Sequence, residues 1–316
     1  MTPVLVYGAY GHTGRFVVAE LRKRGFDPIL SGRDAAKLPG GRPAPVDDPA
    51  SLDRALDGVA AVINCAGPFA VTALPVAEAA IRAGVPYVDV AAEIEANLDT
   101  FELAADTAVV PAMAFFGGLG DLLATAAMGD WTAADEVHVA YGLSGWRPTA
   151  GTLAAGQVSR ERRAGKRVRF AGGRLEHRDD ALPTREWVFP EPLGARPVFG
   201  EFSMADIVTI PRHLNVPSVT SYMTVDAAEG LAAAGERDAA ETFVVDVVVR
   251  AGGRERRIVA RGEDIYAVSA PLAVEAVDRI LTGRTKVKGV APAGEMFDAP
   301  DFLRALAPHI TVSDGG

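Results

Sequence analysis

Three glycines at regular spacing follow an apolar run near the N-terminus, and they are the residues best suited to binding chemistry in this sequence. They lie in the run Gly8-Ala9-Tyr10-Gly11-His12-Thr13-Gly14, between an expected strand at Val4–Tyr7 and an expected helix at Thr13–Arg24. In such a unit the first glycine permits a tight turn, the second lets backbone approach a pyrophosphate, and the third lets the helix pack against the strand. N–H groups at the helix start then attract the phosphate charge. We predict a dinucleotide-binding loop, with a ligand-free tight turn as the alternative; its residues are Gly8, Tyr10, Gly11, His12, Thr13 and Gly14.

The end of the second expected strand, Pro28–Ser31, distinguishes NAD from NADP. A site selective for NAD has an acidic residue there, about 20 residues after the glycine loop, to bind the ribose 2′-hydroxyl. This sequence has Ser31, Gly32 and Arg33 instead, and a guanidinium can bind a 2′-phosphate through two hydrogen bonds. NADP is therefore the predicted cofactor, unless Arg33 is only a solvated turn residue. The residues assigned to this part of the site are Ser31, Gly32, Arg33, Lys37 and Asp47, of which Asp47 is expected beside the adenine or in the cap of the next helix.

A fourth expected strand, Val59–Cys65, leads into the segment predicted to face the nicotinamide. Apolar walls there would exclude water from hydride transfer. Cys65 has no histidine near it in the sequence, so it is better explained as a small buried hydrophobic residue than as a nucleophile. The residues assigned to this part of the site are Cys65, Ala66, Gly67, Pro68 and Phe69.

Reduction of a double bond also needs a proton donor. Asp121 is one candidate, because it follows a Gly-Gly-Leu-Gly turn where the chain leaves the first domain. Tyr141 is the other, because it ends an expected strand before the loop Gly142–Trp146. The alternatives left open are His138, His213 and Tyr222, and the two carboxylates expected either in the site or as structural caps are Asp89 and Glu93.

Two other kinds of chemistry are not expected. Short-chain dehydrogenases need a tyrosine with a lysine four residues later, and none of the six tyrosines has one. The five histidines are far apart and Cys65 is the only cysteine, so no metal site is predicted.

The elements that must position these residues alternate between strand and helix over the first ~115 residues, which is typical of a parallel sheet covered by helices. Six strands in two halves predict a doubly wound Rossmann domain. They are expected at Val4–Tyr7, Pro28–Ser31, Ala44–Val46, Val59–Cys65, Tyr87–Val90 and Ala108–Ala112. Between them we expect the helix Thr13–Arg24, a turn at Asp34–Leu38, a helix opened by Asp48 and Pro49, a helix through Ala80 to Gly84, and a helix at Glu93–Asp106.

The middle of the chain differs, because β-branched alternating segments predominate from about 131 to 261. They predict strands at Glu136–Gly142, Arg167–Phe170, Arg174–His177, Thr242–Arg250 and Arg254–Ala260. Gly172-Gly173 and Gly252-Gly253 indicate hairpin turns. We therefore predict an α/β protein in which residues 1–120 form a Rossmann domain, residues 121–261 form an inserted α+β domain for substrate or oligomerisation, and residues 262–316, with a helix at Ala270–Leu281, return to the first domain.

Several of these runs resemble the saccharopine dehydrogenase-like NADP-binding proteins. The resemblance implies a Rossmann domain interrupted by a substrate domain, and a reductase or dehydrogenase that uses NADP(H). The family includes saccharopine reductases, carboxynorspermidine-type enzymes and trans-acting enoyl reductases. This chain is shorter than the longer members, and its Gly-Gly-Leu-Gly-Asp turn lacks their serine and proline. The matching runs are Gly8–Gly14, Ser31–Arg33, Asn64–Phe69, Tyr87–Val90, Glu93, Phe116–Leu122, Tyr266–Ala270, Gly289-Val290 and Phe297-Asp298.

The charge composition of the chain limits the kinds of partner it is expected to bind. Lys and Arg number 32 and Asp and Glu 41, which gives a net charge of −9 and disfavours binding to nucleic acid or anionic lipid. The uncharged stretch Gly58–Ala77 contains Gly and Pro and fits a strand, a turn and a helix rather than a membrane span, and no secretory signal is evident. A cytoplasmic protein is expected, with a homodimer through the second domain as a further expectation. The basic run Arg160 to Arg169 is expected to be a solvated face, or else to receive an anion.

Together these patterns predict an NADPH-dependent oxidoreductase that reduces an imine, enone or related unsaturated small molecule. The alternative is a non-catalytic NADP-binding sensor or partner protein. An enclosed cleft with a titratable group near the cofactor favours the enzyme, and an open apolar face favours the sensor.

Overall fold

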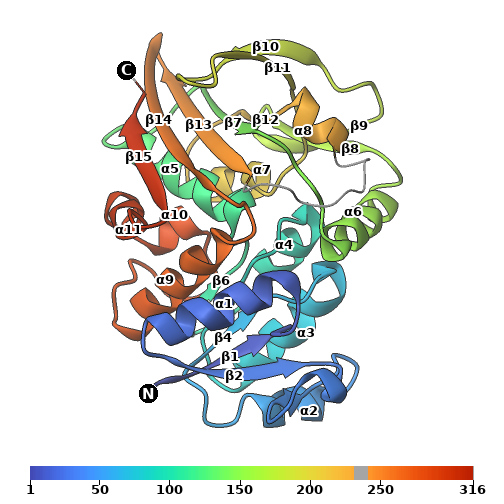
Figure 1. Cartoon of the computed structure of the whole chain (residues 1–316). Helices are drawn as coiled ribbons and strands as arrows, with labels where there is room; N and C mark the ends of the chain where they lie inside the picture. Colours follow the sequence, from blue (N-terminus) through green and yellow to red (C-terminus); the bar gives the residue numbers. More distant parts are fainter. Residues whose placement is uncertain (231–240, 316) are drawn as a thin grey trace.

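The computed structural model describes residues 1–230 and 241–315, and it contains two sheets one above the other (Figure 1). The part of the expected second domain at residues 231–240, and residue 316, lie outside the described residues. The lower sheet in Figure 1 is built by the N-terminal residues and the upper sheet by the middle of the chain.

The lower sheet has six strands in the order β3-β2-β1-β4-β5-β6, all parallel. The order reverses between β1 and β4, which is the doubly wound arrangement predicted from the sequence. β1 and β4 are apolar and almost entirely buried, as expected for parallel strands covered on both faces. The strands are β1 (Pro3–Tyr7), β2 (Asp27–Gly32), β3 (Arg42–Pro43), β4 (Ala61–Asn64), β5 (Tyr87–Asp89) and β6 (Val109–Val110).

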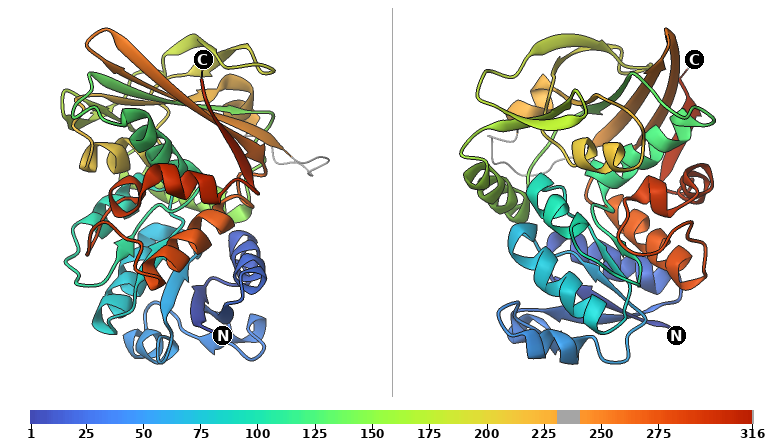
Figure 2. Two further views of the ribbon diagram at one scale, coloured as in Figure 1. Left: turned by 90° about the vertical axis from the view of Figure 1, so that its left-hand side faces the viewer. Right: turned by 180° about the vertical axis from the view of Figure 1, so that it is seen from behind.

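Helices cover both faces of this sheet (Figure 2). The N-terminus of α2 forms as predicted, since the Asp48 carboxylate accepts a hydrogen bond from Ser51 N (3.2 Å) and Pro49 occupies the first helical position. Two expectations on bounds were wrong. The third strand ends before Pro45, whose missing N–H cannot extend a ladder, and the helix expected over Glu93–Asp106 stops at Phe101. The elements are α1 (His12–Lys23), η1 (Ala35–Lys37), α2 (Pro49–Ala55), α3 (Phe69–Arg82) and α4 (Ile94–Phe101).

The upper sheet has nine strands in the described part of the chain, seven of them in the order β10-β11-β12-β7-β13-β14-β15, with the β8–β9 hairpin attached to β12. The two Gly-Gly turns join β8 to β9 and β13 to β14, as predicted. The strands are β7 (Glu136–Leu143), β8 (Arg167–Ala171), β9 (Arg174–Arg178), β10 (Thr184–Val188), β11 (Ala195–Phe199), β12 (Val219–Thr224), β13 (Thr242–Ala251), β14 (Arg254–Glu263) and β15 (Ile310–Asp314).

The two faces of the upper sheet bury different side chains. Along β7, Val139 and Tyr141 belong to the large core shared with the lower domain, whereas Ala140 belongs to a separate core on the opposite face with Trp187. This alternation follows from the two-residue period of a strand. The helices around this sheet are η2 (Phe115–Leu119), α5 (Gly120–Met128), α6 (Ala150–Arg162), α7 (Asp206–Thr209), η3 (Ile210–Arg212) and α8 (Val225–Gly230).

The C-terminal segment belongs to both domains. Helix α9 (Ser269–Leu281) packs beside α1 on the lower sheet, as expected. The following helices α10 (Ala293–Met296) and α11 (Ala299–Ala305) pack on α5, and β15 pairs with β14 at the edge of the upper sheet. The expectation that all of 262–316 returns to the Rossmann domain was therefore wrong. Backbone pairing of β15 with β14 places the last strand in the second domain.

Candidate functional site

The three loop glycines occupy positions that need glycine for different reasons. A Cβ on Gly8, where φ is +83°, would lie 2.9 Å from Ala66, and a Cβ on Gly14 would lie 2.2 Å from the Gly8 carbonyl oxygen. Both glycines are therefore required by the packing of the loop itself. A Cβ on Gly11 would approach only the Gly8 oxygen, at 3.1 Å, and no side chain caps α1 at this position. Gly11 thus leaves a space over the helix N-terminus that a phosphate group can enter.

The end of β2 lies against this loop. Gly8 N donates to the Ser31 carbonyl oxygen (2.9 Å), and the Tyr10 ring lies where a Cβ on Gly32 would be, with the nearest ring carbon at 2.9 Å. The Ser31 hydroxyl is turned away from the loop, because it donates to the Arg42 carbonyl oxygen (2.7 Å) in the buried sheet. Ser31 therefore positions the loop through its backbone, and its side chain is not available to a ligand.

Arg33 has the exposure that binding a phosphate requires. Its side chain is exposed, and no ion pair or hydrogen bond involves it in the described part of the chain. Lys37 adds a second cation, with its Nζ 5.5 Å from the Tyr10 ring centroid and 3.5 Å from Asp34. Asp47 is also exposed. Arg33 thus presents an exposed guanidinium, a group that can bind a phosphate through two hydrogen bonds.

The segment after β4 is held from behind by buried polar groups. Asn64 Oδ1 accepts from Ala66 N (3.0 Å), and the Glu93 carboxylate accepts from Phe69 N (2.8 Å) and Ala70 N (3.0 Å) at the start of α3. Burial raises the pKa of Glu93, although the two N–H donors favour the carboxylate. Glu93 is therefore a helix cap, the structural alternative left open above.

Two residues of this segment are placed differently from one another. Cys65 is partly buried, and burial raises the pKa of its thiol, which fits the hydrophobic interpretation. Phe69 is buried in a small core with Ala73 of α3 and Ala96 of α4. Gly67 is exposed, whereas Ala66 and Pro68 are partly buried and Ala66 packs on the core of the lower domain.

Asp89 has a structural position at the end of β5. It is fully buried and its Oδ1 accepts from Ala91 N (3.0 Å) and Ala112 N (2.8 Å), while the Tyr87 hydroxyl donates to Oδ2 (2.8 Å). Burial raises its pKa to about 6. The carboxylate therefore joins the loops after β5 and β6.

Asp121 and Tyr141 lie behind the site rather than at its surface. Both are fully buried. Asp121 binds His213 Nε2 (2.7 Å) and Gly294 N (2.7 Å), and Tyr141 donates to the Asp206 carboxylate (2.9 Å). The Asp121 carboxylate raises the pKa of His213, although burial opposes this. Their placement gives no support to the expectation that either residue donates a proton to a substrate. The Tyr141 and His213 bonds join elements within the second domain, and the Gly294 bond joins α5 to α10.

The other donors considered from the sequence also lie away from the loop. His138 and Tyr222 contact each other (His138 Nδ1 to Tyr222 hydroxyl, 3.1 Å) on the far face of the upper sheet, in the core that contains Trp187. The His213 side chain is hydrogen-bonded to the buried Asp121 carboxylate.

The residues that do reach the glycine loop come from the start of α6 and from the turn before α9. The Tyr266 ring contacts the His12 ring edge-on, at 5.2 Å between centroids, and its hydroxyl accepts from Trp146 Nε1 (3.2 Å) and Thr149 N (3.3 Å). Trp146 in turn packs on Phe116 at 5.1 Å. Sequence reasoning gave these residues no role. Tyr266 lies in one of the runs that carry the family resemblance, which was the available signal.

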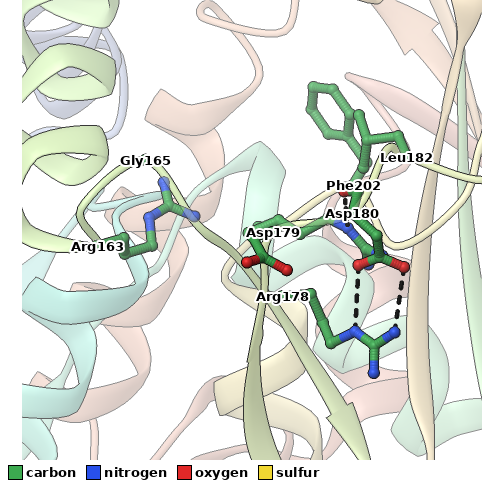
Figure 3. A pocket seen from close by; sticks show the side chains of 9 residues that line it. Arg163, Gly165, Arg178, Asp179, Asp180, Leu182 and Phe202 are labelled. Atoms are coloured by element: carbon green, nitrogen blue, oxygen red, sulfur yellow. Dashed lines mark hydrogen bonds and ion pairs between the residues drawn. The ribbon is translucent and has the colours of Figure 1, made fainter.

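The basic run is largely paired within the protein. Arg162 at the end of α6 binds Asp99 of α4 (2.9 Å), and Arg163, the next residue, binds Glu95 of α4 (3.1 Å). These ion pairs join the upper domain to the lower one. Arg167 binds Asp180 at 2.6 Å. Arg163, Arg167 and Asp180 also line a pocket of about 340 Å³ just after the end of α6 (Figure 3). The pocket is lined by Arg163, Gly165, Arg167, Arg178, Asp179, Asp180, Leu182, Phe202 and Ser203.

Comparison with known proteins identifies the lower domain. Residues 4–110 match the family model of the saccharopine dehydrogenase NADP-binding domain. Residues 4–110 are a saccharopine dehydrogenase-type NADP-binding domain. NADP is its cofactor, as predicted from the Ser31-Gly32-Arg33 sequence.

Similarity to whole proteins covers different parts of the chain. A human saccharopine dehydrogenase-like oxidoreductase is 30% identical over 117 residues, covering 28% of this chain and 27% of that protein, and the Pongo abelii protein of the same name gives the same values. This chain thus spans about a quarter of these relatives' length. Apo saccharopine dehydrogenase (L-Glu forming) from Saccharomyces cerevisiae covers 100% of both chains with a TM-score of 0.69 and 11% identity, which shows a shared fold that extends beyond the NADP-binding domain.

The residues of the NADP-binding domain fit this cofactor. Gly11 leaves open the space above α1, the Tyr10 ring packs on Gly32, and Arg33 is unpaired within the described ranges. These groups would hold the pyrophosphate, the adenosine half and the 2′-phosphate respectively. Within residues 1–230 and 241–315, no helix is long and apolar enough to span a bilayer, and no group of three or more metal-ligating side chains occurs.

Proposed function

We propose that this protein is an NADPH-dependent oxidoreductase that reduces a C=N or conjugated C=C bond of a small molecule. The observation that carries the proposal is the contact between the NADP-binding domain and the second domain at the glycine loop, where Tyr266 lies between His12 and Trp146. A second domain that covers the carboxyl edge of a doubly wound sheet is the arrangement in which such enzymes enclose a substrate.

The chain's own residues divide the work of such a reaction. Bound NADPH supplies the hydride. The glycine loop and Arg33 would hold the nucleotide, and the buried Trp146, packed on Phe116, would exclude water from the space beside it. Glu93 and Asn64 keep the segment after β4 in place. The proton must come from a group that reaches this space.

One observation favours the alternative, a non-catalytic NADP-binding sensor. Both donors expected from the sequence, Asp121 and Tyr141, are fully buried with partners of their own. A sensor would bind NADPH and retain it without consuming it.

A screen for NADPH oxidation separates the two functions. Purified protein with NADPH is offered carbonyl, imine and enoyl compounds, and loss of NADPH absorbance is followed while calorimetry measures NADPH binding. Substrate-dependent oxidation supports the reductase. Tight NADPH binding without oxidation by any of the three classes supports the sensor. A homodimer through residues 121–261 is a separate proposal, which light scattering tests against the 33.1 kDa mass of one chain.

A further inference from the structure

We propose that the cavity after α6 binds a small zwitterion, an amino acid with an apolar side chain, in a second site apart from the cofactor. The cavity of about 340 Å³ lies where the end of α6 and the ends of the β8–β9 hairpin meet the segment between β11 and α7. This volume is at the lower end of the range for small-molecule sites, about 300–1,000 Å³. A molecule the size of an amino acid fits this space.

Most of the charges that line this cavity are already paired. Arg167 Nη2 and Arg178 Nη2 both bind the Asp180 carboxylate, at 2.6 and 3.1 Å, and the Arg178–Asp180 pair is visible in Figure 3. Arg167 is also paired with Glu201. These groups therefore form one wall of the cavity and add little net charge to it.

Arg163 keeps a pair of donors for a ligand at this cavity. Its Nε donates to the Ser159 carbonyl oxygen (3.1 Å) and lies 3.1 Å from Glu95 Oε1. In the part of the chain that the structure describes, its two terminal nitrogens make no hydrogen bond, although the side chain is only 16% exposed. The guanidinium is thus held in place through Nε, and its terminal N–H groups can bind a carboxylate through two hydrogen bonds.

Asp179 supplies the opposite charge at the same cavity. Figure 3 shows its carboxylate between Arg163 and the Arg178–Asp180 pair, with no interaction drawn to any of them. The residue is exposed, and within residues 1–230 and 241–315 no hydrogen bond or ion pair involves it. An ammonium group placed beside this carboxylate would gain charge-assisted hydrogen bonds.

One unpaired cation and one unpaired anion at one cavity favour a ligand that carries both charges. A simple anion bound to Arg163 would lie near the Asp179 carboxylate, and a simple cation bound to Asp179 would lie near Arg163. Each would be repelled by the like charge. The partly buried Leu182 and Phe202 add apolar surface to the lining. They would contact an apolar side chain of the ligand, and its burial would add to the affinity.

This site is separate from the cofactor site, so the proposal does not depend on the reductase function. Arg163 is the C-cap residue of α6, whereas the N-cap residue, Thr149, contacts Tyr266 beside the glycine loop. A helix of 13 residues is about 20 Å long. A ligand at Arg163 therefore does not reach the glycine loop. It does contact the arginine that joins α6 to Glu95 of the lower domain, so binding should raise the melting temperature of the chain.

Calorimetry on the whole chain tests the ligand class. The probes are L-leucine and L-phenylalanine, together with 4-methylpentanoate and 3-methylbutylamine, which are leucine without its ammonium group and without its carboxylate group. Both amino acids should bind, with or without saturating NADP⁺. Each analogue should bind about 10–100-fold more weakly than leucine, the effect of losing hydrogen bonds to a charged group. The proposal is overturned if neither amino acid binds, if an analogue binds as tightly as leucine, or if NADP⁺ displaces leucine.

Three substitutions test the position of the site. Asp179→Asn should abolish the preference for leucine over 4-methylpentanoate, and Arg163→Gln should abolish the preference for leucine over 3-methylbutylamine. Arg162→Gln is the matched control, because it removes the neighbouring ion pair to α4 from outside the cavity lining, and it should keep the leucine affinity. NADP⁺ affinity and the melting temperature report whether each variant is folded.

Unchanged leucine binding in Asp179→Asn overturns the proposal, and this exposed position decides the question even if Arg163→Gln does not fold. An equal loss of leucine affinity in Arg162→Gln and Arg163→Gln also overturns it, because binding would then depend on the contact between the domains and not on the Arg163 guanidinium.

Discussion

Arg33 and Gly11 are the residues whose substitution tests the cofactor site most directly, because neither side-chain position is used by the fold. Arg33 has no ion pair or hydrogen bond in the described ranges, and the position of a Cβ on Gly11 is open except toward the Gly8 oxygen. By contrast, the Ser31 hydroxyl is hydrogen-bonded within the sheet, and a side chain at Gly8 or Gly14 would clash with the backbone of the loop and its neighbour Ala66. Substituting residues of these two kinds should separate binding from stability.

Replacing Arg33 with alanine should weaken NADP(H) binding by about 1.5–3 kcal/mol, the range for hydrogen bonds to charged groups. NAD(H) binding should stay nearly unchanged, since NAD lacks the 2′-phosphate. Calorimetric titration of both cofactors measures this difference. Arg22→Ala, which removes an exposed cation at the other end of α1, is the matched control. Equal losses for both cofactors, or tighter NAD(H) than NADP(H) binding in the wild type, would refute the assignment of Arg33.

Gly11→Val and Gly14→Ala should have opposite effects. Valine at Gly11 fills the space over the helix N-terminus while φ stays at −70°, which any residue adopts, so the melting temperature should persist and the stabilisation by NADP⁺ should vanish. Alanine at Gly14 places a methyl group 2.2 Å from the Gly8 oxygen and should cost about 1–3 kcal/mol of stability. Thermal melts with and without NADP⁺ measure both effects. Full stabilisation of Gly11→Val by NADP⁺ would show that the loop is a structural turn.

At the scale of elements, the start of α3 depends on one carboxylate from another segment. Glu93 accepts from Phe69 N and Ala70 N, so Glu93→Ala leaves two backbone donors without their partner. The loss should be about 1–3 kcal/mol of folding stability, and NADP⁺ affinity should also fall because α3 begins next to the loop after β4. Denaturant unfolding and calorimetry measure the two quantities. Glu95→Ala, which removes the partner of Arg163 instead, should spare the affinity; an equal loss of affinity there would contradict the local role of Glu93.

Elements with local signals could be predicted from the sequence, and elements that depend on distant pairing could not. β1, β2, β4 and β5 are short apolar runs between turn residues, and the hairpins at β8–β9 and β13–β14 have Gly-Gly turns. β10 and β15 each bury only one residue, so neither shows the apolar–polar alternation that predicts a strand. They form because they pair with the edges of β11 and β14. Tyr141 shows the same limit in the site. Its strand was predicted, but the side of the sheet it faces follows from pairing with β12 and β13.

At the scale of the whole molecule, buried polar groups and the C-terminal segment hold the two sheets together. Asp121 joins α5 to α10 through Gly294, and the α4–α6 ion pairs close the opposite side. β15 then returns to the upper sheet after α9 has packed on the lower one. Cofactor binding in the lower domain should therefore raise the stability of the whole chain in one transition.

The buried Asp206 should make the free energy of unfolding of the protein fall as the pH rises. Burial raises the pKa of the Asp206 carboxyl to about 7. The hydrogen bond from Tyr141 opposes this increase, and the nearby Asp121 charge adds to it. The ordinary pKa is 3.8, so between about pH 4 and pH 7 the folded protein binds a proton that the unfolded chain releases. The free energy of unfolding then decreases with pH across this interval, by a few kcal/mol in total, and is constant above it.

Asp206→Asn removes this contribution, because asparagine does not titrate and its oxygen can still accept from Tyr141. The variant's melting temperature should therefore change less than that of the wild type between pH 5 and pH 8. Asp180→Asn is the contrasting control: Asp180 is exposed and Arg178 lowers its pKa to about 2, so it contributes no slope in this interval. Thermal melts of the three proteins at several pH values measure the slopes. Parallel curves for wild type and Asp206→Asn would mean that Asp206 is already ionised in the folded protein at pH 5, and that the core beside Tyr141 holds a charge rather than a proton.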